Sequence, residues 1–105
     1  MSAQTILNFE RPPTAADRFQ EFHATNPAVA DTLELLAAQM IDRGRKHFGI
    51  GLLFEVLRWN FYMSTTDANS DFKVNNNYRS HYARLLISRH PEWINIIETR
   101  ELRTI

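Results

Sequence analysis

The sequence predicts an all-α fold, a compact single domain of four to five short helices with one short extended segment. Three observations predict it. Apolar residues recur at helical spacing in successive segments. Residues that start and stop helices separate those segments. The 105 residues are 44% hydrophobic and include seven Phe, three Tyr and two Trp, which is enough for a modest core. A divergent helix-turn-helix or winged-helix-like arrangement is the candidate topology.

The first helix is predicted over about 14–24, after an N-terminal arm over 1–13 that ends in two prolines. Thr14 is a suitable N-cap, and Asp17 follows three residues later, close to a capping box. Phe19 and Phe22 supply an apolar stripe. The single helical domain is therefore expected to span 14–105.

A second helix is predicted over about 27–43. Asn26 is a candidate N-cap and is followed by proline, which is favoured at the first helical position. Gly44 lies where a left-handed C-terminal cap belongs. The apolar positions at helical spacing are Val29, Leu33, Leu36, Ala37, Met40 and Ile41.

The third helix, about 51–63, is apolar nearly all round, so we expect it to be the central buried helix. Trp59 or Tyr62 at an oligomer interface is the alternative, because one small domain has limited surface with which to cover such a helix.

The remaining chain predicts one short extended piece and two further helices. Phe72 and Val74 alternate with polar neighbours, which favours the extended piece. Asn75 or Asn76 can cap a helix over about 77–90, and Pro91 ends that helix and can begin another. The expected buried side of the helix over 77–90 consists of Tyr78, Tyr82, Ala83, Leu85 and Leu86.

The stretch 71–90 is the strongest indication of function. It has no acidic residue after Asp71, and on a helical wheel one arc of roughly 100° gathers polar side chains able to bond base edges or phosphates. These are Asn77, Ser80, His81, Arg84 and Ser88. Flanking phosphate contacts are expected from Lys73, Arg79 and Arg89. A different anionic partner, or a solvated basic helix face with no partner, is the alternative.

Arg45 and Lys46, beside His47 and between the glycines of the loop before the third helix, form a second candidate anion site. An ordinary turn between helices is the alternative.

Charge is divided unevenly along a chain whose formal net charge is zero. Residues 1–42 hold two basic and six acidic residues, and residues 43–105 hold ten basic and six acidic residues, so the halves carry −4 and +4. Such a pattern can orient a protein on a polyanion.

Several function classes are disfavoured. Without cysteine there is no disulfide framework and no thiolate metal site. The calcium-like spacing of Asp67, Asn69 and Asp71 lacks the required glycine and bidentate glutamate. No nucleophile motif is present, so we expect neither an enzyme nor a cofactor. The N-terminus lacks signal-peptide features, and the longest apolar run is too short for a bilayer, which predicts a cytoplasmic protein with no membrane partner.

Three blocks carry a resemblance to a known family: RGRKHFGIGLLFEVLRW, DFKVNNNYRSHYARLL and ETREL, in that order. The chain resembles, from about Phe19 onward, an uncharacterised family of small bacteriophage and prophage proteins. The resemblance implies a phage-associated protein in the host cell cytoplasm, and it supplies no catalytic residues.

The leading hypothesis is a small nucleic-acid-binding protein, for DNA rather than RNA, that uses the helix over 77–90. A lone domain with few phosphate contacts binds DNA weakly, so this hypothesis also predicts a homodimer. The alternative is a phage-encoded interaction module that binds or inhibits a host protein. The zero net charge favours that alternative, because dedicated DNA-binding domains are usually basic.

Overall fold

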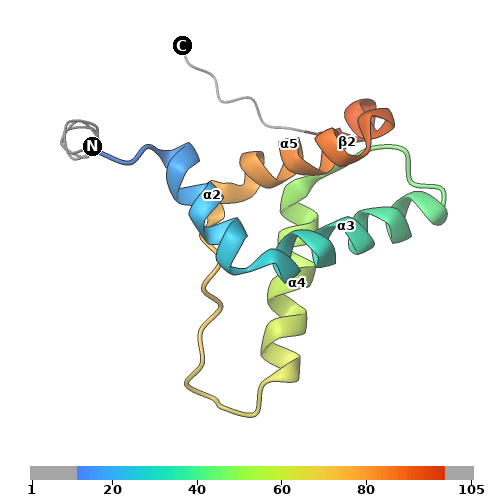
Figure 1. Ribbon diagram of the computed structural model, residues 1–105. Helices are drawn as coiled ribbons and strands as arrows, with labels where there is room; N and C mark the ends of the chain where they lie inside the picture. Colours follow the sequence, from blue (N-terminus) through green and yellow to red (C-terminus); the bar gives the residue numbers. More distant parts are fainter. Residues whose placement is uncertain (1–11, 99–105) are drawn as a thin grey trace, which may run out of the picture.

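The computed structural model describes residues 12–98 and confirms the predicted single, mainly helical domain (Figure 1). Most of the predicted N-terminal arm, and the tail over 99–105, lie outside the described residues. The elements in chain order are α2 (Ala15–Thr25), α3 (Pro27–Asp42), β1 (Phe48–Gly49), α4 (Ile50–Ser64), η1 (Asn76–Tyr78), α5 (Arg79–Arg89), η2 (Pro91–Asn95) and β2 (Ile97–Glu98).

The predicted start of α2 is confirmed as a capping box. The Thr14 hydroxyl accepts a hydrogen bond from the backbone N–H of Asp17 at 3.1 Å, and the Asp17 carboxylate accepts one from the backbone N–H of Thr14 at 3.0 Å. Two of the donors that a helix N-terminus leaves free are thereby satisfied.

Asn26 ends α2 and does not cap α3 through its side chain, contrary to the prediction. Its amide Nδ2 and its backbone N–H both donate to the carbonyl of Phe22, at 3.1 and 2.8 Å. The single residue between the helices therefore caps the end of α2 by donating twice to one carbonyl. Pro27 begins α3 without needing an N–H partner.

The predicted stop signal at Gly44 is confirmed, because this residue has a φ of +89° just after α3. Glycine adopts that left-handed conformation without steric cost, whereas other residues rarely do. The chain can therefore reverse at once into the loop that leads to β1.

The extended segment predicted around Phe72 and Val74 is not a strand. Within residues 12–98 the two strands are β1 and β2, which pair in parallel with Phe48 opposite Ile97. Residues 65–75 form a loop in which Phe72 packs against the ring of Phe61 at 5.9 Å. Alternation alone does not make a strand where no neighbouring backbone supplies the ladder bonds.

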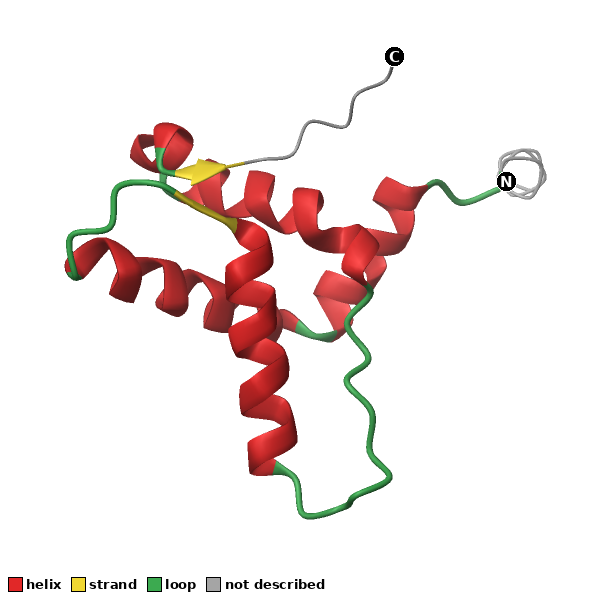
Figure 2. Ribbon diagram, turned by 180° about the vertical axis from the view of Figure 1, so that it is seen from behind, coloured by secondary structure: helices red, strands yellow, loops and turns green. Residues whose placement is uncertain are grey.

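The final helix expected after Pro91 is also different. The chain makes only the short 3-10 helix η2 before it becomes extended at β2 (Figure 2). After Ile96 the backbone hydrogen-bonds to β1 and does not continue into a further helical turn.

The centre of the core is α5 and not α4. Tyr82, Ala83 and Leu86 of α5 have no exposed surface, whereas the buried residues of α4 lie only in its first five positions. The contacts of α5 reach α3, α4, η2 and β2. Figure 2 shows the C-terminal half of α4 projecting away from the other helices. The helix that was expected to be central is therefore buried only near its N-terminus, and Phe61 in its C-terminal half contacts the loop residue Phe72.

The connections between helices differ from those of a helix-turn-helix, which has a turn of about three or four residues. One residue joins α2 to α3, and residues 65–75 separate α4 from η1. The described residues contain no antiparallel hairpin that could act as a wing, since their two strands are parallel.

Candidate interaction surfaces

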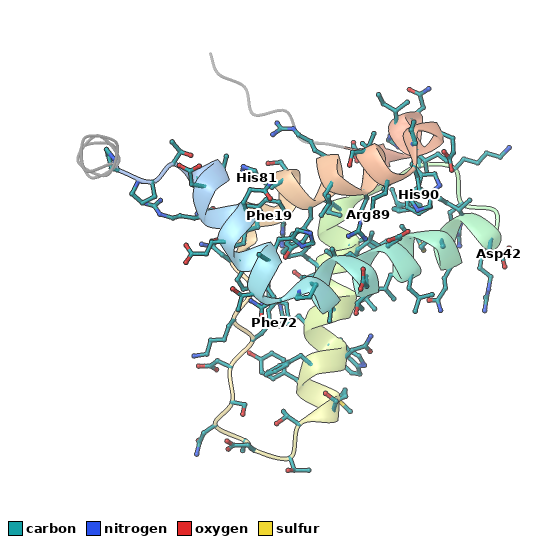
Figure 3. The ribbon with its side chains drawn as sticks, viewed as in Figure 1. Phe19, Asp42, Phe72, His81, Arg89 and His90 are labelled. Carbon is teal, nitrogen blue, oxygen red and sulfur yellow. The ribbon has the colours of Figure 1, made fainter. Side chains whose placement is uncertain are left out.

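The helix predicted over 77–90 is divided into η1, which holds Asn77, and α5, and its polar arc is only partly exposed. Ser80 is buried, and His81 is half-buried and stacks on Phe19 of α2 with ring centroids 5.1 Å apart (Figure 3). Asn77 and Arg84 remain exposed, as does Ser88, whose hydroxyl donates to the backbone carbonyl of Leu85. The burial of Ser80 and the stacking of His81 on α2 remove two of the five side chains from the predicted reading face.

The contact between Phe19 and His81 belongs to an aromatic cluster that joins α2 to α5. Phe19 also meets Tyr82 edge to face at 4.7 Å and stacks on His23 at 5.9 Å. The hydroxyl of Tyr82 has no hydrogen-bond partner among residues 12–98, and burial together with the nearby Tyr78 raises the pKa of Tyr82 to about 12. These ring contacts join α2 to α5.

Arg79 lies against α4 and is occupied there. Its Nη2 atom is 3.4 Å from a carboxylate oxygen of Glu55, and its guanidinium lies over the ring of Phe54, 5.5 Å from the centroid. A side chain added at Gly51 would meet the guanidinium at 3.3 Å, so glycine leaves the space in which Arg79 packs. Arg79 therefore joins two helices, although its position suggested a phosphate contact.

Arg89 is likewise paired within the protein, with two acidic residues of α3. Its Nη1 atom lies 2.6 Å from Glu34 Oε1 and 3.3 Å from Asp31 Oδ1. His90 Nε2 lies 2.6 Å from the other oxygen of Glu34, and the His90 ring stacks on Trp93 at 3.9 Å. Figure 3 shows Arg89 and His90 at the junction of α5 with α3. The hydrogen bonds from His90 and Arg89 lower the pKa of Glu34 below its ordinary value of 4.5.

Four of the predicted basic contacts are exposed and have no ion-pair partner in the described part of the chain: Lys73, Arg84, Arg45 and Lys46. They do not form one continuous patch. The loops over 43–47 and 65–75 lie on opposite sides of the molecule in both ribbon views (Figures 1 and 2). The predicted nucleic-acid surface is therefore reduced to Lys73, Asn77 and Arg84, with the pair at 45 and 46 apart from them.

No grouping of three or more His, Asp or Glu side chains within residues 12–98 could hold a metal ion. The Asp67 carboxylate accepts a hydrogen bond from the backbone N–H of Asn69 at 2.9 Å. That contact is typical of a local turn.

An apolar stripe on α4 extends the alternative that placed Trp59 at an oligomer interface, although sequence reasoning did not identify the other residues of the stripe as a site. Leu52, Val56, Trp59 and Met63 recur at intervals of four, three and four residues, which places them on one face of the helix. Leu52 is 47% exposed, Trp59 65% and Met63 66%, and Val56 is half-buried. The α4 stripe, as we call these four residues, is free of charge. An i, i+4, i+7, i+11 pattern was the available signal.

The α4 stripe borders a hollow of about 540 Å³ between α3 and α4. Leu36 and Met40 of α3 form one wall, Leu52 and Val56 of α4 form the other, and Asp42 and Arg43 lie at one end. Its size falls within the range of about 300–1,000 Å³ that is usual for binding clefts. A second hollow of about 460 Å³ lies under the loop that carries Phe72, between α2, α3 and the C-terminal half of α4.

No known protein family, curated protein or solved structure matches this chain. None of the described helices is long and apolar enough to cross a membrane.

Proposed function

We propose that this protein is a helical protein–protein interaction module whose contact surface is the α4 stripe. The observation that carries the proposal is the exposure of Trp59 and Met63, together with Leu52, on the helix face turned away from the buried Ile50, Leu53 and Phe54. Contiguous exposed apolar side chains on a soluble domain usually mark an interaction surface, and Trp is among the residues enriched at interaction hot spots.

The arrangement of charge supports this function over nucleic-acid binding. Arg79 and Arg89, two of the expected phosphate contacts, are paired with acidic residues of their own chain. Salt-dependent attraction to phosphates needs free cations, and the described surface offers few that lie together. The α4 stripe has none and suits an apolar partner surface.

A phage origin rests on the family resemblance alone. It supports a bacterial host protein as a partner and the host cytoplasm as the location. The proposal involves no enzymatic step and no cofactor.

The proposal predicts that association depends on the α4 stripe. The double variant Trp59→Glu/Met63→Glu and the wild-type protein would be immobilised and exposed to bacterial lysate and to free wild-type protein. We expect the immobilised variant to retain less than about one tenth of the protein that the wild type retains. The reason is that a charge buried at an interface without a partner costs several kcal/mol. The matched control is Ile94→Glu, which changes an apolar side chain that is 62% exposed on η2, away from the stripe. Equal retention by the stripe variant and the wild type would contradict the proposal.

Nucleic-acid binding is the second candidate, favoured by the exposure of Lys73, Asn77 and Arg84. Fluorescence anisotropy with labelled duplex and single-stranded DNA at low and physiological salt separates the two functions. A salt slope that indicates about four or more phosphates, lost in Lys73→Ala/Arg84→Ala, would favour nucleic acid. The interaction module predicts no binding at physiological salt.

A further inference from the structure

The α4 stripe has two halves of opposite shape. At its N-terminal half Leu52 and Val56 line the hollow of about 540 Å³ beside α3. At its C-terminal half Trp59 and Met63 stand out from the helix, each about two-thirds exposed. One surface therefore carries both a recess and the large apolar side chains able to fill a recess.

We propose that the occupant of the α4 stripe is a second copy of this chain, with the two α4 helices packed antiparallel about a two-fold axis between Val56 and Trp59. This inference rests on the proposed function and names its partner. A two-fold axis brings the same patch of both copies together, so a recess and a protrusion on one patch satisfy each other twice. Antiparallel packing sets Trp59 of each copy against Val56 of the other, and Met63 against Leu52. Large side chains then face smaller ones at the axis.

Charge also favours a second copy. The chain has a formal net charge of zero, so two copies approach without net repulsion, which promotes self-association. Glu55 and Arg58, the charged residues of α4, contact one another at 3.4 Å. Arg58 also donates to Asn76 at 3.3 Å and lies over the ring of Phe72 at 4.8 Å. These charges are occupied within one copy and require no partner across the interface.

The size of the stripe suits a modest dimer. Its four residues run over about 16 Å of helix, and the exposed part of Trp59 offers on the order of 150 Å² for burial. Specific interfaces begin at about 600 Å² per partner, so a dimer would also have to bury the walls of the hollow. We therefore expect reversible dimerisation in the micromolar range.

The first measurement is sedimentation equilibrium of the full chain over a range of concentrations. Wild-type protein should shift from 12.3 kDa towards twice that mass as its concentration rises. Trp59→Glu and, separately, Met63→Glu should remain monomeric, whereas Ile94→Glu should dimerise like the wild type. Because Trp59 and Met63 are exposed, these variants should keep the helical circular dichroism of the wild type.

The second measurement tests the antiparallel arrangement and exploits the absence of cysteine from the sequence. With a short bis-maleimide, Val56→Cys should cross-link to itself, because the two copies of this position meet near the axis. Met63→Cys alone should not, since its two copies lie about 16 Å apart along the helices. A mixture of Leu52→Cys and Met63→Cys should give a mixed cross-linked dimer.

The outcomes separate this inference from the proposed function. A wild-type protein that stays monomeric, yet captures another protein through the α4 stripe, overturns the second copy and leaves the interaction module intact. Efficient self-cross-linking of Met63→Cys overturns the antiparallel packing. Dimerisation that survives both glutamate substitutions places the interface elsewhere and overturns the inference.

Discussion

Glu34 links α3 to the end of α5 through two neighbouring residues, Arg89 and His90, each 2.6 Å from one of its carboxylate oxygens. The Glu34, Arg89 and His90 side chains are each close to one-third exposed, so solvent weakens these contacts without abolishing them. Because both contacts favour the ionised carboxylate, the pKa of Glu34 is lower in the folded state than its ordinary value of 4.5.

This lowered pKa predicts a pH-dependent contribution to stability. A carboxyl group whose pKa is depressed by folding stabilises the protein above its unfolded pKa, and the contribution is lost as pH falls through the folded value. Glu34→Gln should therefore lower the free energy of unfolding by about 1 kcal/mol at pH 7. The difference from the wild type should shrink as pH falls below about 4.5. Urea unfolding between pH 3 and 7 measures it.

The control for this prediction is Glu21→Gln, which changes an exposed acidic residue of α2. Its effect should be small at every pH. A Glu34→Gln penalty that is the same at pH 3 as at pH 7 would show that the ionised carboxylate does not support the junction of α3 and α5.

At the scale of the helices, α4 and α5 exchange the roles that their sequences suggest. The segment that is apolar all round lies half outside the core, and the segment rich in basic and polar residues passes through its middle. Tyr82, Ala83 and Leu86 are enough to bury one side of α5, because the arginines on either side extend outward to carboxylates on α3 and α4.

The exchange predicts opposite results for one substitution at two leucines. Leu86→Ala in α5 should lower the free energy of unfolding by about 2–5 kcal/mol, because Leu86 has no exposed surface and its truncation leaves a cavity. Leu52→Ala in α4 should cost less than about 1 kcal/mol, because Leu52 is 47% exposed. Chemical unfolding of dilute protein compares them. Equal losses, or a larger loss at position 52, would restore α4 as the central helix.

Over the whole molecule, the opposite charges of the two chain halves meet inside one fold. Asp31 and Glu34, from the acidic half, contact Arg89 from the basic half, so part of the expected dipolar pattern is neutralised between α3 and α5. Arg79 pairs with Glu55 within the basic half, which further reduces its free charge. Charge that looked available for a polyanion therefore contributes to stability, because each contact joins elements distant in sequence.

This pairing predicts that added salt weakens the fold. Raising NaCl from about 0.05 to 0.5 M shortens the screening length severalfold and should lower the free energy of unfolding by about 0.5–1 kcal/mol. Thermal or urea unfolding at both salt concentrations measures the change. Glu34→Gln should show a smaller salt effect than the wild type. Stability that rises with salt in both proteins would mean that the ion pairs contribute little.

The sequence by itself determined three of the helix boundaries, because the signals at these boundaries are local. Thr14 with Asp17, Pro27 and Gly44 act through neighbouring backbone groups, and each lies at the boundary it predicted. Local signals could not show which strands pair or which helix is most deeply buried. Phe48 pairs with Ile97 far along the chain, and Ser80 is buried only because other helices cover it. Tertiary packing decided which cations are paired and left the α4 stripe exposed, since both depend on contacts between distant segments.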